Sequence, residues 1–122
     1  RLGAELEIIL IVNSDVPAPK GKPYDKDSIA EYVGEARAGF ELIEDRGADY
    51  SRLAVNPLIM DAGWNGGSVL AKPNKNWRKL DLGNLEGSVS FDGKVVRTGH
   101  SGDVLGHCYN SLAWLANKLG DH

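Results

Sequence analysis

Apolar and polar positions come in blocks along the chain, and the first block predicts a strand. Residues 3–12 read GAELEIILIV, in which an aliphatic run from Ile8 follows two acidic residues, Glu5 and Glu7. A run this apolar predicts a strand that is buried on both faces. Because side chains alternate along a strand, the two glutamates share one face. Like charges there repel each other and resist desolvation, so they require protonation, a cationic partner or a bound metal ion.

The next blocks predict a loop, a short helix and a second strand. The stretch SDVPAPKGKPYDKD carries three of the five prolines and several charges, which indicates a solvated loop. Ser28 and Glu31 have the spacing of a capping box, so we expect a helix that begins at Ser28 and ends near Ala36. Residues 36–46, ARAGFELIEDR, then place a third acidic residue, Glu41, within an apolar strand.

A glycine-rich segment follows in the middle of the chain. Residues 58–73, LIMDAGWNGGSVLAKP, begin with apolar side chains and resume as a short strand after the glycines. We expect Gly63, Gly66 and Gly67 to form a turn between these two parts, because glycine permits backbone geometry that other residues resist.

The last third of the chain predicts a hairpin and an amphipathic helix. Residues 87–99 alternate on either side of an Asp-Gly pair at 92–93, a pair favoured in two-residue hairpin turns. Beyond it, apolar residues recur at helical spacing. This spacing predicts a helix that is capped by Ser101 or Asp103, ends at Gly120 and packs on the sheet.

Composition narrows the classes of partner. The chain has 122 residues and fits one domain, which we take as 1–122. A formal net charge of -3 leaves no basic excess for nucleic acid, and no apolar run approaches the roughly 18 residues of a membrane span. The single cysteine, Cys108, cannot form an intramolecular disulfide and most simply indicates the cytoplasm. Since the first residue is Arg1, we also expect a piece of something longer.

Glu5, Glu7 and Glu41 each stand in an apolar, strand-like context and form a candidate site. Ligation by carboxylate oxygens alone suits magnesium or manganese, whereas zinc more often recruits His or Cys. Two interpretations stay open from the spacing alone. The carboxylates could hold a divalent metal ion, or they could be salt-bridged or lie at a solvated strand end.

Four motifs succeed one another along the chain: AELEIILIV, FELIEDR, MDAGWNGGSVLAKP and SVSFDGKVVRTGHSGDVLGHCYNSLAWLANKLG. Together they resemble the branch of the fumarylacetoacetate hydrolase superfamily that contains 2-keto-4-pentenoate hydratase, 2-oxohept-4-ene-1,7-dioate hydratase and 4-oxalocrotonate decarboxylase. The resemblance covers nearly the whole chain. It implies an α+β fold, in which a mixed, strongly bent β-sheet roll carries few helices. It also implies that Glu5, Glu7 and Glu41 are the ligands of one Mg²⁺ or Mn²⁺ ion.

The resemblance further implies a reaction. The substrate would be a short 2-oxo or 2-hydroxydienoic acid of aromatic catabolism, hydrated through a metal-stabilised enolate. Asp61 would be a catalytic residue, and Trp64 and Arg46 would line the substrate pocket. Many relatives read ADNASS where this chain reads MDAGWN at residues 60–65, so the substrate itself stays open.

Each of these side chains also has a plainer interpretation. Arg46 could form a structural salt bridge, Asp61 could cap the backbone before the glycine-rich turn, and Trp64 could close a loop over the core. We expect His107 to be packed or hydrogen-bonded rather than a ligand, and Cys108 to be a small core residue.

Other functions stay open beside the hydratase. Relatives are about twice as long, so the chain could be a truncated, non-catalytic relative that acts as a binding or assembly module. A decarboxylase or an acylpyruvate-type hydrolase of the same superfamily is a further alternative. We expect a homo-oligomer, a dimer or larger, because strands bared by missing flanks would have unpaired edges.

Overall fold

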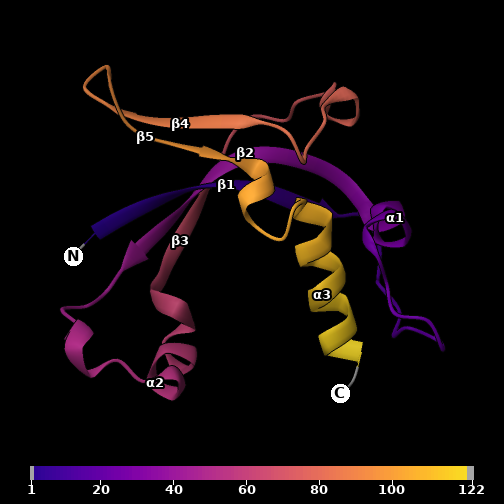
Figure 1. Cartoon of the computed structure of the whole chain (residues 1–122), viewed down its shortest axis with the longest axis horizontal. Coiled ribbons are helices and arrows are strands. Elements are labelled where there is room, and N and C mark those ends of the chain that lie inside the picture. Colours follow the sequence, from indigo (N-terminus) through magenta and orange to yellow (C-terminus); the bar gives the residue numbers. More distant parts are fainter. Residues whose placement is uncertain (1, 121–122) are drawn as a thin grey trace.

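The computed structural model describes residues 2–120 and contains two small sheets with few helices (Figure 1). The strands are β1 (Leu2–Val12), β2 (Val33–Glu44), β3 (Asn65–Leu70), β4 (Glu86–Phe91) and β5 (Lys94–His100). The α-helices are α1 (Lys26–Ile29), α2 (Val55–Met60) and α3 (Cys108–Gly120). The short 3-10 helices are η1 (Ala30–Tyr32), η2 (Tyr50–Arg52), η3 (Ala62–Trp64), η4 (Trp77–Lys79) and η5 (Ser101–Asp103). This content agrees with the predicted α+β class.

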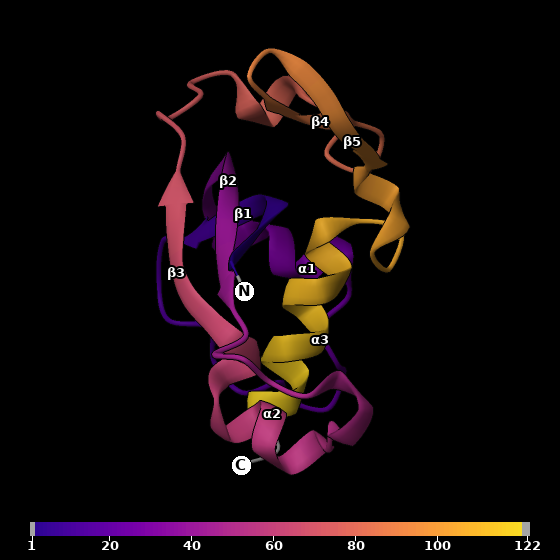
Figure 2. The same ribbon diagram turned by 90° about the vertical axis from the view of Figure 1, so that its left-hand side faces the viewer.

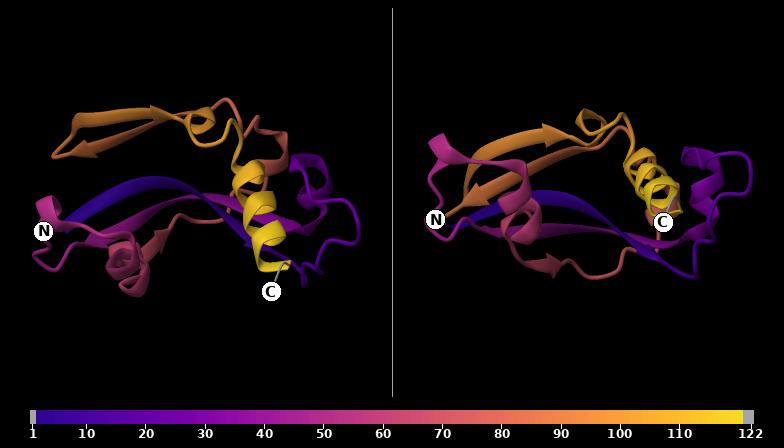
Figure 3. Two further views of the ribbon diagram at one scale, coloured as in Figure 1. Left: turned by 60° about the horizontal axis from the view of Figure 1, so that its bottom comes forward. Right: turned by 90° about the horizontal axis from the view of Figure 1, so that it is seen from below.

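The larger sheet has the strand order β1-β2-β3, and β4 and β5 form a separate hairpin. Both β1 and β2 curve along their length (Figure 3). Every strand pair within residues 2–120 is antiparallel, so the parallel pairing that a mixed sheet requires is not found there. A single strongly bent roll stays a prediction.

Strand β1 is less buried than its sequence predicts. Its residues from Ile8 to Ile11 are half-buried, and the others are exposed. The β4-β5 hairpin and α3 lie on one side of the three-stranded sheet (Figure 2). Ile8 and Leu10 pack against the core on that side. The prediction of a strand buried on both faces is therefore wrong, since even the run from Ile8 to Ile11, whose side chains alternate between the two faces, is only half-buried.

The first helix begins earlier and ends sooner than predicted. Its cap is Asp25, whose Oδ1 accepts a hydrogen bond from the Ser28 amide at 2.9 Å, while the Ser28 hydroxyl accepts from the Asp25 amide at 2.9 Å. Ser28 thus closes a capping box instead of opening one. Strand β2 already begins at Val33. Pairing within the sheet places Val33 and Ala36 in the core, where both are buried.

The glycine-rich segment is also arranged differently from its prediction. Residues Leu58 to Met60 belong to α2, and of the three glycines only Gly63 lies between α2 and β3, where it is part of η3. Gly66 and Gly67 lie inside β3.

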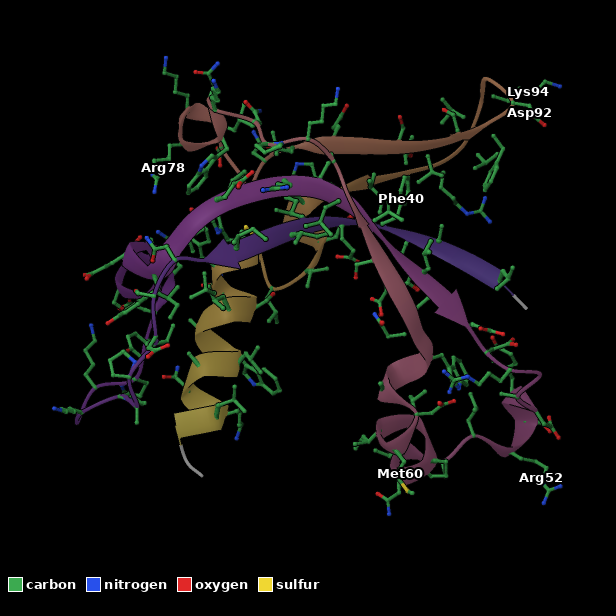
Figure 4. The ribbon with its side chains drawn as sticks, turned by 180° about the vertical axis from the view of Figure 1, so that it is seen from behind. Phe40, Arg52, Met60, Arg78, Asp92 and Lys94 are labelled. Carbon is green, nitrogen blue, oxygen red and sulfur yellow. The ribbon has the colours of Figure 1, made fainter. Side chains whose placement is uncertain are left out.

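The hairpin prediction is confirmed. Asp92 and Gly93 have φ values of 48° and 76°, the left-handed geometry that a tight two-residue turn requires. Asp92 and Lys94 lie at its tip (Figure 4).

The last helix begins at Cys108, later than the predicted caps. Ser101 and Asp103 form η5 instead. His107 precedes the helix, and its Nδ1 accepts a hydrogen bond from the Tyr109 amide at 3.0 Å. His107 is therefore hydrogen-bonded, as predicted.

The core lies where β2 meets η4 and α3. Its buried residues are Val33, Ala36, Trp77 and Leu82, and the half-buried Cys108 packs against them. The prediction that Cys108 is a small core residue is confirmed. Across residues 2–120, no helix has the length and apolar character needed to cross a membrane.

Candidate metal centre

Three glutamates gather on one face of the larger sheet. Glu5 and Glu7 alternate with apolar residues along β1 and so share a face, and Glu41 of β2 lies directly opposite Glu5 in the strand register. One carboxylate oxygen from each residue lies within 4.8 Å of those of the other two. The structure thus brings together the three predicted ligands, at a spacing that a single small cation can bridge.

The cluster carries three formal negative charges without a recorded protein counter-ion. Of the ion pairs recorded within residues 2–120, none includes Glu5, Glu7 or Glu41. Arg37 lies on the same face of β2, but its Nη2 donates to Oε2 of Glu35 at 2.7 Å. The salt-bridged interpretation therefore has no support in the part of the chain that the structure describes.

Burial and charge repulsion both act on Glu7. Partial burial raises the pKa of the Glu7 carboxyl group above its ordinary value of 4.5, and the neighbouring charges of Glu5 and Glu41 raise it further. A divalent cation between the three carboxylates would offset the effects of burial and of the neighbouring charges, because it stabilises the ionised form of each carboxylate.

This raised pKa predicts a pH effect on the metal-free protein. Since the folded-state pKa of Glu7 lies above the unfolded value near 4.5, its contribution to stability is fully present below that pH and is lost as pH rises through the folded pKa. We expect Glu7→Gln to remove this loss. The variant should match the parent near pH 4 and be more stable near pH 7 by up to about 1 kcal/mol. Urea unfolding of both proteins in chelator over this range measures the difference, and a variant less stable than the parent near pH 7 would contradict the repulsion.

Asn65, the first residue of β3, contacts the cluster directly. Its side-chain Nδ2 donates a hydrogen bond to Oε1 of Glu41 at 2.7 Å. Sequence reasoning gave Asn65 no role, because its contact depends on how β3 pairs with β2, and no local motif signals that pairing.

Arg46 and Asp61 lie together. They form an ion pair with each other. Within residues 2–120 neither has a recorded hydrogen bond or ion pair to the three carboxylates. A salt bridge for Arg46 was the plainer interpretation, whereas a catalytic role for Asp61 and a pocket role for Arg46 stay predictions.

Trp64 occupies a constrained turn. Its ring packs edge-to-face on Tyr50, with the ring centroids 5.3 Å apart. Ala62, Gly63 and Trp64 have φ values of 49°, 62° and 65°, so three successive residues adopt the left-handed conformation. That conformation costs a non-glycine residue roughly 1–2 kcal/mol. A pocket role for Trp64 stays a prediction.

A groove of about 790 Å³ lies between β1, the β4-β5 hairpin and α3. Leu6, Ile8 and Leu10 line it, and they alternate with the glutamates along β1, so it opens mainly on the opposite face of the sheet. Glu5 and Glu7 also line it, along the edge strand β1. The groove thus reaches the edge of the carboxylate cluster.

Comparison with known proteins identifies similar sequences, although no protein-family profile matches the chain. The chain is 28% identical over 117 residues to 2-hydroxyhexa-2,4-dienoate hydratase of Comamonas testosteroni, covering 96% of this chain and 43% of that protein. It is 30% identical over 117 residues to 2-hydroxypent-2,4-dienoate hydratase of Pseudomonas putida, covering 96% and 51%. It is 28% identical over 123 residues to 2-oxo-hept-4-ene-1,7-dioate hydratase of Escherichia coli, covering 97% and 45%. The chain spans about half the length of these relatives.

Solved structures share the fold. The chain superposes on 4-oxalocrotonate decarboxylase from Pseudomonas putida G7, complexed with magnesium and adipate, with a TM-score of 0.84 and 21% identity. The match covers 98% of this chain and 44% of that chain. The same enzyme complexed with calcium and acetate gives a TM-score of 0.80 at 22% identity, covering 98% and 43%. The resemblance predicted from the four sequence motifs is confirmed.

Proposed function

We propose that this chain, which resembles 2-oxo-4-enoate hydratases over nearly all of its length, is the metal-binding part of a hydro-lyase. The observation that carries the proposal is the cluster of Glu5, Glu7 and Glu41, three carboxylates within reach of one cation. Hydratases of 2-hydroxydienoic acids among its relatives support the reaction class. Because the chain spans only about half of those proteins, the activity of the whole enzyme is part of the proposal.

The donor set fits Mg²⁺ or Mn²⁺. It consists of carboxylate oxygens alone, which these hard cations prefer, and it includes no nitrogen or sulfur ligand of the kind that zinc recruits. A 4-oxalocrotonate decarboxylase of the same fold is complexed with magnesium, which supports a divalent ion here. When bound, such an ion supplies a Lewis acid that stabilises negative charge developing on a 2-oxo acid.

The protein's own groups would hold the ion and complete the site. Glu5, Glu7 and Glu41 would bind it from two neighbouring strands, whose pairing sets their separation. Asp61 would accept or donate protons, and Arg46, its ion-pair partner, would line the substrate pocket. Trp64, packed on Tyr50, would border the substrate. The substrate would be a short 2-oxo or 2-hydroxydienoic acid of aromatic catabolism.

A decarboxylase is the second candidate, because a solved structure that superposes on the chain is a decarboxylase. Partial coverage also leaves open an acylpyruvate-type hydrolase and a non-catalytic binding or assembly module. We further propose a cytoplasmic homo-oligomer and a strongly bent roll. Large exposed apolar side chains support a covering partner, such as Leu2 at 87% and Met60 at 87% exposed.

A spectrophotometric assay tests the reaction. Hydration of 2-hydroxypenta-2,4-dienoate breaks its conjugation, so absorbance should fall when the protein is supplied with Mg²⁺ and should not fall in chelator. We expect Glu41→Gln to lower kcat/KM at least about 100-fold, since it removes a ligand of the ion. Release of carbon dioxide from 4-oxalocrotonate would favour the decarboxylase. Magnesium binding without turnover of either acid would favour the non-catalytic module.

A further inference from the structure

We infer that Asn65 is a positioning residue for Glu41, one that holds its carboxylate in place for the divalent ion of the proposed function, on which this role rests. The hydrogen bond from Asn65 Nδ2 to Glu41 Oε1 is 2.7 Å long. Within residues 2–120 it is the one side-chain hydrogen bond recorded to any of the three clustered glutamates. All three glutamates lie on strands, and among them Glu41 is the one with this side-chain partner in the described residues.

An irregularity in β3 puts Asn65 on the correct face of the sheet. Ser68 pairs with Glu41 and therefore shares its face. In a regular strand Asn65, three residues away from Ser68, would point to the other face. The pairing shifts between Leu42 and Ile43, however, so that Leu42 lies opposite Gly67 and Ile43 lies opposite Asn65.

One step on β2 thus spans two steps on β3, and Gly66 is the extra residue of a β-bulge. The bulge reverses the alternation and turns the Asn65 side chain toward Glu41. Glycines make it possible: Gly67 has a φ of 145°, and a Cβ on Gly66 would lie 3.2 Å from the carbonyl oxygen of Leu42. Gly66 and Gly67 therefore permit the bulge, which a regular strand would not need.

The segment before Asn65 holds the bulge in register. The three left-handed residues of η3 lead directly into it, and Trp64 is packed on Tyr50. The Tyr50 hydroxyl in turn donates to Oδ2 of the buried Asp45 at 2.9 Å. Asn65 is thus fixed by a ring contact on one side and by strand pairing on the other.

The hydrogen-bond donor to Glu41 is a neutral amide, which is compatible with metal binding by Glu41. An amide N–H satisfies one lone pair of Glu41 and fixes the plane of the carboxylate, leaving the other lone pairs for a cation. A lysine or arginine at this place would also orient Glu41, but its charge would oppose cation binding. An amide orients the ligand and leaves the full negative charge of the cluster.

Calorimetric titration of Mg²⁺ into the metal-stripped chain tests this role. Asn65→Leu keeps the approximate shape and removes the donor, and we expect it to raise the dissociation constant about tenfold. Asn65→Gln keeps the amide on a longer side chain and should restore part of the affinity. Asn56→Ala, which alters an exposed asparagine of α2, is the matched control and should bind as the parent does.

A spectroscopic readout separates positioning from folding. In the parent, the side-chain amide resonance of Asn65 should shift on addition of Mg²⁺, and that of Asn56 should not. This measurement needs no variant, so it holds even if Asn65→Leu fails to fold. An Asn65→Leu protein that binds Mg²⁺ as tightly as the parent, or an Asn65 resonance that does not respond while the parent binds, would overturn the role of Asn65 and leave the metal site standing. A parent that binds no Mg²⁺ would overturn the metal site and this role together.

Discussion

Replacing both Glu5 and Glu7 by glutamine is expected to abolish magnesium binding and the stabilisation that magnesium gives to the folded chain. The change removes two of the three clustered carboxylates and leaves neutral amides, which attract a hard cation far less strongly. An ion that binds only the folded state stabilises it by about 2.7 kcal/mol at 100 times its dissociation constant. The parent should gain this amount, and the double variant should gain nothing measurable.

Urea unfolding with and without saturating Mg²⁺ measures this difference. In chelator, the double variant should be at least as stable as the parent, because the partly buried charge of Glu7 and its repulsion by Glu5, which raise the pKa of Glu7, are gone. Glu31→Gln, which alters an exposed glutamate of η1, is the control and should keep the magnesium effect. A double variant that magnesium stabilises as much as the parent would place the ion elsewhere.

Truncation of Trp77 to alanine is expected to cost the largest amount of folding free energy, about 3–5 kcal/mol. Trp77 lies in η4, is 6% exposed and packs with Val33 and Leu82 in the core. The guanidinium of Arg78 lies 4.3 Å from the centroid of its ring and would lose this contact as well. For a small domain this loss is a large share of the total stability.

Trp114 provides a matched control for this truncation. It is the same residue type on α3, but it is 58% exposed, so Trp114→Ala should cost less than about 1 kcal/mol. Denaturant unfolding of the two variants compares them directly. Equal losses at the two positions would show that the core is not centred on Trp77.

The glutamate cluster could be predicted because its signals are local. Alternation along one strand puts Glu5 and Glu7 on the same face, and charge within an apolar run marks Glu41 as unusual. The hairpin was predictable for a similar reason, since its turn pair carries the needed backbone geometry in two adjacent residues.

The remaining features depend on contacts that a single sequence does not display. The exposure of β1 depends on which elements pack beside the sheet, such as the hairpin and α3. The early end of α1 follows from the pairing and burial of Val33, which outweigh local helical preference. The contact of Asn65 with Glu41 follows from the bulge at Gly66. Without the register between β2 and β3, the sequence at Gly66 and Gly67 predicts a turn instead.

The most direct test of the metal site is calorimetric titration of Mg²⁺ and Mn²⁺ into the metal-stripped chain, with and without oxalate, a mimic of the enolate of a 2-oxo acid. We expect one ion to bind per chain, to bind more tightly when oxalate is present and to lose its binding in the Glu5→Gln/Glu7→Gln variant. An absence of binding heat for both metals in the parent would contradict the account. The three carboxylates would then be solvated by water and would not bind a cation.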